Sequence, residues 1–242
     1  MNEMGISAEI KTRNEKASTT RMSQNNPEYA AMVESVDRSV GRVMNKLKEL
    51  DLIKNTIVVF TSDNGGLSTL QRNLRSGPAS CLPLRAGKGW LYEGGIKIPT
   101  IISWPSQITP GTLSDTPITT CDIYPTLLTA TGLIDKSNQS VDGVDLTPLF
   151  EDKELKERSL FWHFPHYHGS GNRPSSSIRK GSFKLIRWYQ DGSEELYNLN
   201  TDISEENDLS KVNASKRIEL SNELSRWLKS SGAKLPEVNK DN

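Results

Sequence analysis

Cysteine is scarce in this sequence, whose 242 residues include only Cys81 and Cys121. At most one disulfide can form, which excludes a small disulfide-stapled scaffold and leaves the redox compartment undetermined. A charge of one sign is also lacking, since 30 basic residues balance 30 acidic ones. We therefore expect neither nucleic acid nor an anionic membrane as a partner. No apolar run approaches the roughly 20 residues that a membrane-spanning helix needs.

The beginning of the sequence has little apolar character. Its first stretch reads MNEMGISAEIKTRNEKAS, and it has no apolar core of the kind that a secretory signal carries. Residues 1–26 show little periodicity and many Ser, Thr, Asn and Lys residues. We expect no secretory signal in this stretch, and we expect residues 1–26 to be irregular.

A helix and a buried strand are predicted next. Asn26 is suited to cap a helix, Pro27 suits its first turn, and apolar residues then recur three or four apart up to Leu47. Residues 56–60 have no polar alternation, which is typical of a fully buried parallel strand. This order predicts an α/β sheet with helices on its faces. Ligands of such sheets usually bind beyond the carboxyl ends of the strands, which here means residues 61–66.

The sequence changes character in its last third. Before the change, residues 97–105 predict a short strand and residues 122–133 a short buried helix. After it, aromatic or alternating stretches between Gly, Asp and Ser turns predict three or four antiparallel strands, and residues 211–229 predict an amphipathic helix. We therefore divide the chain into an α/β part, residues 1–154, and a small α+β subdomain, residues 155–242.

Two hard oxygen ligands are adjacent in the stretch TSDNGG. Asp63 offers a carboxylate and Asn64 a carboxamide, which suit Ca²⁺ or Mg²⁺. The following Gly65 and Gly66 allow a sharp turn and a close approach to an ion or a phosphate-like group. The alternative is an ordinary turn, for which Asp, Asn and Gly are equally typical.

A single lysine lies between two glycines in the stretch LRAGKGWLYEGG. Lys88 is therefore expected on an exposed loop that a ligand can approach closely, where its ammonium can hold an oxyanion as a point charge. The alternative is a solvated surface lysine. The EGG turn that follows has no function that its residues alone disclose.

Taken together and in order, three segments resemble the type I sulfatases: NTIVVFTSDNGG, PLRAGKGWLYEGGIKIPTIISWP and TTCDIYPTLLTATG. The resemblance is closest to arylsulfatase A and N-acetylgalactosamine-6-sulfatase relatives, and it covers nearly the whole chain from Pro27 onward. It implies part of an alkaline-phosphatase-like sheet sandwiched by helices. A small subdomain with an antiparallel sheet and a C-terminal helix is expected to follow.

The resemblance also implies a chemistry. In that family the Asp-Asn pair completes a divalent-cation site, so Asp63 and Asn64 are expected to bind Ca²⁺, or alternatively Mg²⁺. The lysine of the G-K-G step contacts the substrate sulfate, so Lys88 is expected to be both catalytic and substrate-binding. The implied activity is hydrolysis of sulfuric esters, either aryl sulfates or sulfated sugars. A cation and a lysine would stabilise the negative charge that gathers on the sulfate oxygens.

Cys81 matches the letters of the family's nucleophile motif, in which the cysteine of C-x-P-S-R becomes formylglycine. That motif lies far upstream of the T-S-D-N-G segment in the family, whereas Cys81 lies downstream, where the family's pattern is P-L-R-x-G-K-G. Formylglycine is therefore not expected at Cys81. It is expected in the family's N-terminal half, along with an early Asp-Asp pair that has no counterpart before Pro27.

The chain therefore resembles the C-terminal portion of a sulfatase, and activity of these residues alone is in doubt. One alternative is an inactive relic or a module that only binds sulfated glycans. Another is a phosphoesterase of the same superfamily. The family suggests a periplasmic, secreted or lysosomal location.

All three histidines lie close together, in the stretch FWHFPHYHG. Histidine alternating with aromatic residues can line a sugar-binding cleft, and we expect His166 to contact the substrate. The alternative is that these residues pack at a domain junction.

Overall fold

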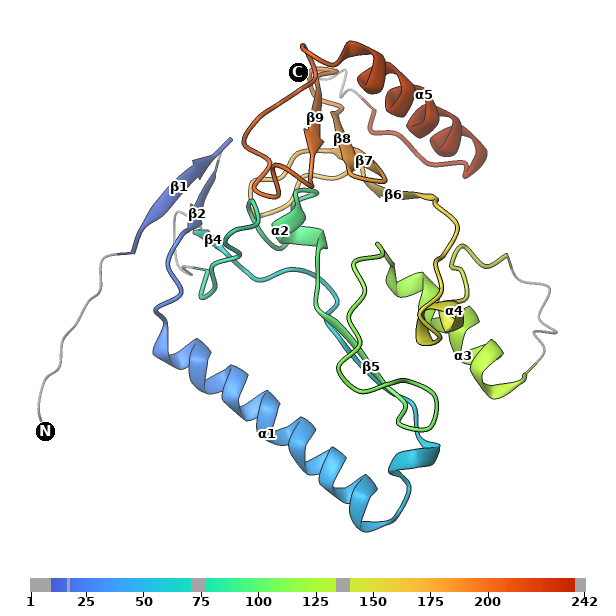
Figure 1. Cartoon of the computed structure of the whole chain (residues 1–242). Helices are drawn as coiled ribbons and strands as arrows, with labels where there is room; N and C mark the ends of the chain where they lie inside the picture. The colour runs from blue at the N-terminus through green and yellow to red at the C-terminus, as the bar shows by residue number, and fades with distance from the viewer. Residues whose placement is uncertain (1–9, 17, 71–76, 134–139, 238–242) are drawn as a thin grey trace, which may run out of the picture. The chain divides into compact units, whose positions relative to one another are not determined.

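The structure is a computed structural model of the chain, and it describes residues 10–16, 18–70, 77–133 and 140–237 (Figure 1). The chain divides into two compact units, neither of which is one consecutive stretch. The first comprises Met1–Asp37, Thr61–Pro99 and Ser159–Asn242, and the second comprises Arg38–Phe60 and Thr100–Arg158.

The predicted division after residue 154 lies close to Ser159, where the chain enters the first unit for the last time. That unit also takes in residues 61–99, which the sequence analysis assigned to the other part of the chain. The long helix α1 (Pro27–Glu49) begins in the first unit and ends in the second.

The first unit begins with two strands that the sequence analysis did not predict. Strands β1 (Thr12–Glu15) and β2 (Ser18–Arg21) pair antiparallel, and β2 pairs in turn with β4 (Thr69–Leu70). The expectation that residues 1–26 are irregular is therefore wrong for Thr12–Glu15 and Ser18–Arg21. The strands escaped detection because their buried side chains are polar, Glu15 and Arg21 among them, so no apolar alternation marks them.

Four further strands of the first unit form one antiparallel sheet, as predicted. Its strands lie in sequence order: β6 (Ser159–Phe164), β7 (Ser175–Lys180), β8 (Phe183–Trp188) and β9 (Glu194–Asn198). Short turns join consecutive neighbours from β7 to β9, which is the arrangement that Gly- and Ser-containing turns favour.

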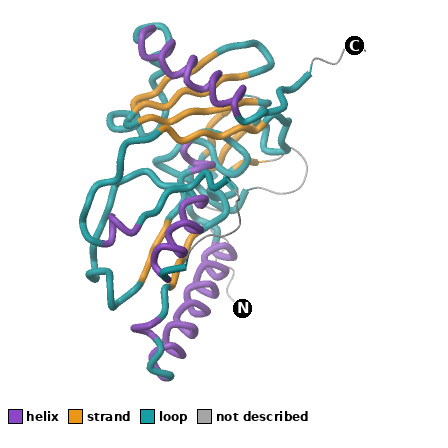
Figure 2. Tube along the Cα trace, turned by 90° about the vertical axis from the view of Figure 1, so that its right-hand side faces the viewer, coloured by secondary structure: helices purple, strands orange, loops and turns teal. Residues whose placement is uncertain are grey.

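Helix α5 (Ala214–Ser230) covers one face of this sheet, as Figure 2 shows. Its N-cap is Asn213, whose side chain accepts a hydrogen bond from the Lys216 amide. The buried apolar residues of the helix recur every four positions and pack against one buried residue from each of β7, β8 and β9. This cluster comprises Leu220, Leu224, Leu228, Ile178, Leu185 and Leu196. The predicted amphipathic helix is confirmed.

The opposite face of the same sheet packs against the segment that precedes the short helix α2 (Glu93–Ile96). Because side chains alternate along a strand, Ile186 and Trp188 of β8 point away from α5 and join Trp90 and Tyr92 in a second buried cluster. The segment that carries Lys88 is thus fixed to a well-packed sheet.

Helix α1 begins as predicted, with the Asn26 side chain accepting a hydrogen bond from the Tyr29 amide at 2.9 Å. None of its residues is buried. Its apolar stripe is exposed instead, with exposed fractions between 52% and 66% at Met32, Val33, Val36 and Val43. No helix in the described ranges is long and apolar enough to cross a membrane.

The second unit contains the predicted strand near residues 56–60 as β3 (Val58–Thr61), which pairs with β5 (Thr100–Ser103). The expectation that this strand is fully buried is wrong, since Phe60 is 38% exposed and its neighbours are half-buried. The reason is that this sheet has two strands in the part of the chain that the structure describes, so its faces are poorly covered.

The remaining elements are short helices. They are the 3₁₀ turns η1 (Ile53–Asn55) and η2 (Thr120–Asp122), and the helices α3 (Ile123–Thr131) and α4 (Thr147–Phe150). Gly132 ends α3 in the left-handed conformation at φ 68°. Buried Asp122 organises this part of the second unit by accepting bonds from the amides of Thr119 and Val144 and by pairing with Arg158.

Candidate functional site

The site that the sequence predicts is built from three glycine-containing turns of the first unit. The turn after β3 is held to the EGG turn by a hydrogen bond from the Gly65 amide to the Gly95 carbonyl at 3.0 Å. It is also held to the GKG turn, because the Lys88 amide donates to the Gly66 carbonyl at 2.9 Å. The backbone of Lys88 is therefore directly bonded to the turn that carries the predicted metal ligands.

These turns approach so closely that glycine is required. A Cβ atom at Gly65 would overlap the carbonyl oxygen of Gly94, and one at Gly87 would overlap the carbonyl oxygen of Gly66. Neither position has a positive φ, so the requirement comes from space and not from backbone conformation. The glycines thus let three loops meet at one place.

The predicted site residues are accessible there. Asp63 and Lys88 are exposed, and Asn64 is half-buried. Asn64 is two residues from Gly66, about 7 Å of extended chain, so its backbone lies near that of Lys88. Over the ranges that the structure describes, neither the Asp63 carboxylate nor the Lys88 ammonium has a hydrogen-bond or ion-pair partner. Both groups are available for a ligand.

The donor chemistry of Asp63 and Asn64 suits a hard divalent cation. Ca²⁺ takes six to eight oxygen ligands, however, and two side chains cannot complete its shell. No group of three His, Cys, Asp or Glu side chains among the described residues is arranged to hold a metal ion. The two residues therefore fit part of a cation site, and further ligands would have to come from elsewhere.

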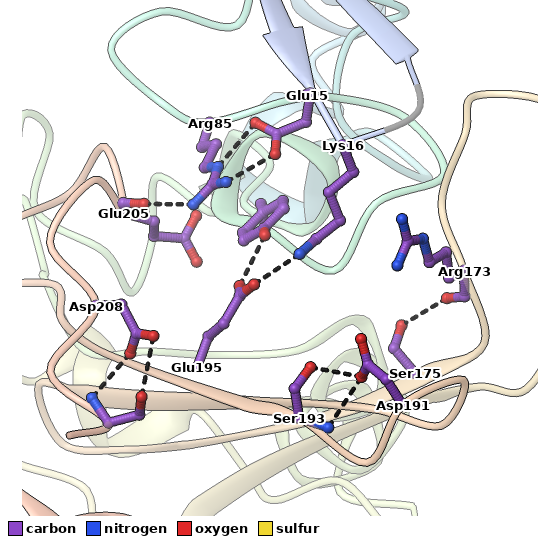
Figure 3. A network of polar contacts seen from close by, with 12 residues as sticks. Glu15, Lys16, Arg85, Arg173, Ser175, Asp191, Ser193, Glu195, Glu205 and Asp208 are labelled. Carbon is purple, nitrogen blue, oxygen red and sulfur yellow. Dashed lines mark hydrogen bonds and ion pairs between the residues drawn. The ribbon is translucent and has the colours of Figure 1, made fainter.

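Arg85 fixes the beginning of the GKG turn (Figure 3). Its guanidinium donates to both carboxylate oxygens of Glu15 at 2.8 and 2.7 Å, to the hydroxyl of Tyr197 at 3.1 Å and to the carbonyl of Glu205 at 2.6 Å. It also stacks over the ring of Tyr92, 3.9 Å from the centroid. The hydrogen bonds and the nearby acidic groups raise the pKa of Arg85, although burial opposes them.

Glu93 fixes the end of the same segment, which gives the EGG turn a structural role. Its carboxylate pairs with the fully buried ammonium of Lys184 at 3.0 Å, and Lys184 also pairs with Glu205 at 2.9 Å. The second oxygen of Glu205 accepts a hydrogen bond from the Glu93 amide at 2.6 Å. Burial raises the pKa of Glu205, and the charge of Lys184 opposes this shift. This buried ion group ties α2 to β8.

A third polar contact lies beside Arg85. Glu195 accepts hydrogen bonds from the hydroxyls of Tyr92 at 2.7 Å and Tyr197 at 3.0 Å, and pairs with Lys16 at 2.7 Å. Burial, followed by the nearby charge of Glu195, raises the pKa of both tyrosines, which therefore stay protonated as donors.

Cys81 is half-buried and unpaired by any disulfide. Its thiol lies 3.4 Å from the carbonyl of Gly66, and burial raises its pKa. A reactive cysteine needs the opposite, a lowered pKa that favours the thiolate. The expectation that formylglycine is not formed at Cys81 stays a prediction.

The three histidines have different environments. His163, on β6, is held by Ser176 at 2.7 Å and by the carbonyl of Lys234 at 3.0 Å, so it packs structurally. His166, the predicted substrate contact, is exposed, and its ring lies at right angles to that of Phe164 with the centroids 5.8 Å apart. Its predicted role stays a prediction.

His168 is the histidine that lies against the GKG turn. A Cβ at Gly89 would overlap its Nδ1 atom and lie 2.7 Å from its Cε1 atom. The sequence analysis grouped His168 with the other two histidines and expected His166 to contact the substrate. The local pattern could not decide between them, because the contact of His168 joins two loops that are far apart along the chain.

Comparison with known proteins gives two matching family models. The model described as Sulfatase matches residues 7–133, and the one described as the C-terminal region of N-sulphoglucosamine sulphohydrolase matches residues 86–233.

The chain is 35% identical over 247 residues to a sulfatase of Formosa agariphila, covering 92% of this chain and 43% of the relative. It is 32% identical over 176 residues to the N-acetylgalactosamine-6-sulfatase of Mus musculus, covering 72% of this chain and 32% of the relative. The chain thus spans less than half the length of these relatives.

Solved structures match as well. Ps i-CgsB, solved in complex with k-i-k-neocarrahexaose, has a TM-score of 0.70 at 31% identity, over 85% of this chain and 43% of that one. A protein solved with its substrate D-glucosamine-2-N,6-O-disulfate has a TM-score of 0.68 at 27% identity, over 83% of this chain and 40% of that one. The predicted fold, part of an alkaline-phosphatase-like α/β domain followed by a small α+β subdomain, is confirmed by these neighbours.

Proposed function

Because the chain belongs to the sulfatase family, we propose that it serves the hydrolysis of sulfuric esters, with sulfated sugars as the favoured substrates and aryl sulfates as the alternative. The names of the relatives support the sugar class. One is an N-acetylgalactosamine-6-sulfatase, and a structural neighbour was solved with a sulfated glucosamine as its substrate.

One observation carries this proposal. The hydrogen bond between the Lys88 amide and the Gly66 carbonyl brings a lysine without an ion-pair partner in the described ranges to the turn that offers two hard oxygen ligands. An ammonium and a cation site at one place suit a substrate that carries a negatively charged sulfate group.

In this proposal Lys88 holds the sulfate oxygens as a point charge and stabilises the negative charge that grows on them as the S–O bond breaks. Asp63 and Asn64 would supply two of the oxygen ligands of a divalent cation, Ca²⁺ or Mg²⁺, which would polarise the sulfate as a Lewis acid. Rigidity matters here, since a misplaced charge stabilises the transition state poorly. Arg85 and Glu93 supply it by fixing both ends of the loop.

The nucleophile is assigned to a formylglycine outside these residues, and not to Cys81. Because the described residues offer neither that nucleophile nor a full cation shell, we expect the 242-residue chain alone to release no sulfate.

The test is hydrolysis of p-nitrophenyl sulfate against p-nitrophenyl phosphate by the natural protein that contains these residues. We expect the sulfate to be the better substrate and Lys88→Ala to lower kcat about 10²- to 10³-fold, as loss of one charge-stabilising donor does. Lys97→Ala, which removes another exposed lysine, is the matched control and should retain activity. A preference for the phosphate ester would contradict the proposal.

A further inference from the structure

The loop from His166 to Asn172 forms a second wall beside the GKG turn. His168 Cε1 and Ser170 Oγ would lie 2.7 and 2.6 Å from a Cβ at Gly89, so only a glycine with its positive φ of 88° lets the two loops meet. Since Gly89 follows Lys88 directly, the imidazole lies against the backbone of the residue next to the lysine that is proposed to bind sulfate.

The His168 ring is fixed in one tautomer. The Ser170 amide donates to Nδ1 at 3.2 Å, and the Ser170 hydroxyl is 2.9 Å from the same atom. An atom that accepts from a backbone N–H carries no proton, so in the neutral ring the proton lies on Nε2. His168 therefore presents Nε2–H as a hydrogen-bond donor.

That donor is available to a ligand. His168 is exposed, and within the described ranges its Nε2 atom has no hydrogen-bond partner. The position of His168 is nevertheless defined. Its ring packs at a steep angle against the ring of Phe164, with the centroids 5.9 Å apart, and its backbone amide donates to the Asn172 carbonyl at 3.1 Å. A donor that is both held in place and unpaired is suited to bind an anionic oxygen.

Both loops contain buried polar groups that lack hydrogen-bond partners among the described residues, and Asn172 is the first of them. Its side chain is 1% exposed, and neither of its amide atoms has a hydrogen-bond partner in the described part of the chain. The indole N–H of the buried Trp90, in the segment that follows Gly89, is also without one. Buried polar groups normally find partners, so orphaned groups on both loops indicate polar contacts that these residues do not supply.

From these contacts we propose that His168 contacts the sulfated substrate, donating from Nε2 to an oxygen of the sulfate group or of the ester linkage. Lys88 would hold that same group from the other loop. The inference rests on the proposed function, since it names a further substrate-contacting residue at the same site. It places the contact at His168 and not at His166.

The test is NMR of the full chain labelled with ¹⁵N at histidine, using two-bond ¹H–¹⁵N correlations that report which ring nitrogen carries the proton. Before ligand is added, the His168 signals should show the Nε2–H tautomer. Addition of galactose 6-sulfate should shift the Nε2 signal of His168 and leave those of His163 in place. Unsulfated galactose should shift neither, and inorganic sulfate tests whether the sulfate group alone is enough.

His168→Gln is expected to weaken galactose 6-sulfate binding about ten- to a hundredfold, the effect of losing one hydrogen bond to a charged group. His166→Gln removes an exposed imidazole from the same loop and is the matched control, with unchanged affinity expected. Because both positions are exposed, neither change should unfold the chain.

The proposal is overturned if His168 shows the Nδ1–H tautomer, if its signals ignore every sulfated ligand, or if His166→Gln and not His168→Gln weakens binding. A response to inorganic sulfate supports a contact to the sulfate group, and a response to the sulfated sugar alone supports a contact at the ester linkage. If the natural protein proves inactive on sulfate esters while His168 still responds, the proposed function fails and this inference stands. If it is active and His168 does not respond, this inference alone fails.

Discussion

At the scale of single residues, close approach explains the glycines better than backbone conformation does. Gly65→Ala places a Cβ on the carbonyl oxygen of Gly94, and backbone on both sides must move. We expect a loss of about 2 kcal/mol or more in the free energy of unfolding, the range of overpacking. The measurement is the midpoint of denaturant unfolding. An unchanged slope of the transition would show that the shift in midpoint reports stability.

Gly41→Ala is the matched control for that change. Gly41 lies within α1, and a Cβ there meets nothing within 4 Å. Alanine is the better helix former, so this variant should gain about 0.5–1 kcal/mol. Equal effects of the two substitutions would refute the account of close packing among the loops.

Some single residues were predictable from the sequence and others were not. Asn26 was found because helix caps have a local signature, and the structure confirms it. Lys88 was singled out by its neighbouring glycines, a local pattern that the structure explains by the contact with Gly66. His168 belongs to a cluster of histidines that the sequence does reveal, but nothing local distinguishes it from His166, since its position depends on a contact with a distant loop.

At the scale of elements, a buried ion group joins α2 to β8. Lys184→Met removes the cation, so Glu205 loses its ion-pair partner in the described ranges and Glu93 keeps only Arg179, whose Nη1 is 3.6 Å away. Breaking a buried pair from one side costs about 3–5 kcal/mol, and we expect that loss in the free energy of unfolding. Lys211→Met, at an exposed lysine, should change it little. Comparable losses in the two variants would argue against this group as a structural anchor.

The same group predicts a pH dependence. Burial raises the pKa of Glu205 in the folded protein above its ordinary value of 4.5. A carboxyl whose pKa is raised by folding makes its full contribution to stability at pH values below its ordinary pKa. This contribution is lost as the pH rises through the pKa that the carboxyl has in the folded protein. Glu205→Gln removes the titration and keeps an oxygen for the Glu93 amide.

We therefore expect the unfolding free energy of Glu205→Gln, relative to the unchanged chain, to increase as pH rises from 4.5. Equilibrium urea unfolding of both proteins at a series of pH values measures this difference. A difference that stays constant, or falls as pH rises, would show that the carboxyl does not have a raised pKa in the folded protein.

The elements differ in how far they could be read from sequence. Strands β6 to β9 and helix α5 were predicted because one or both faces are apolar, so periodicity shows them. Strands β1 and β2 were missed because their buried side chains are polar and are satisfied by polar partners, as Glu15 is by Arg85, so no apolar periodicity marks these strands. Strand β3 was placed correctly, but its burial depends on neighbours that a local pattern cannot report.

At the scale of the whole molecule, the fold class was predictable because several individually weak motifs occur in the order typical of one family. That resemblance can be recognised without knowing which segments contact one another. The division into two units was not predictable in the same way. The first unit joins residues 61–99 to a sheet that begins at Ser159, through buried contacts such as Glu93 with Lys184. Such pairings are decided by tertiary packing and leave no local pattern.

The exposed apolar stripe of α1 predicts how the chain behaves in solution. Met32, Val33, Val36 and Val43 fall within an arc of about 100° around the helix, since each residue advances by about 100°. A continuous exposed apolar stripe favours association. We expect the 242-residue chain to self-associate as its concentration rises, as measured by sedimentation velocity, and Val36→Glu to reduce that association. Asn45→Glu adds the same charge on the opposite side of α1 and should leave association unchanged, so an equal effect of both variants would assign it to net charge and not to the apolar stripe.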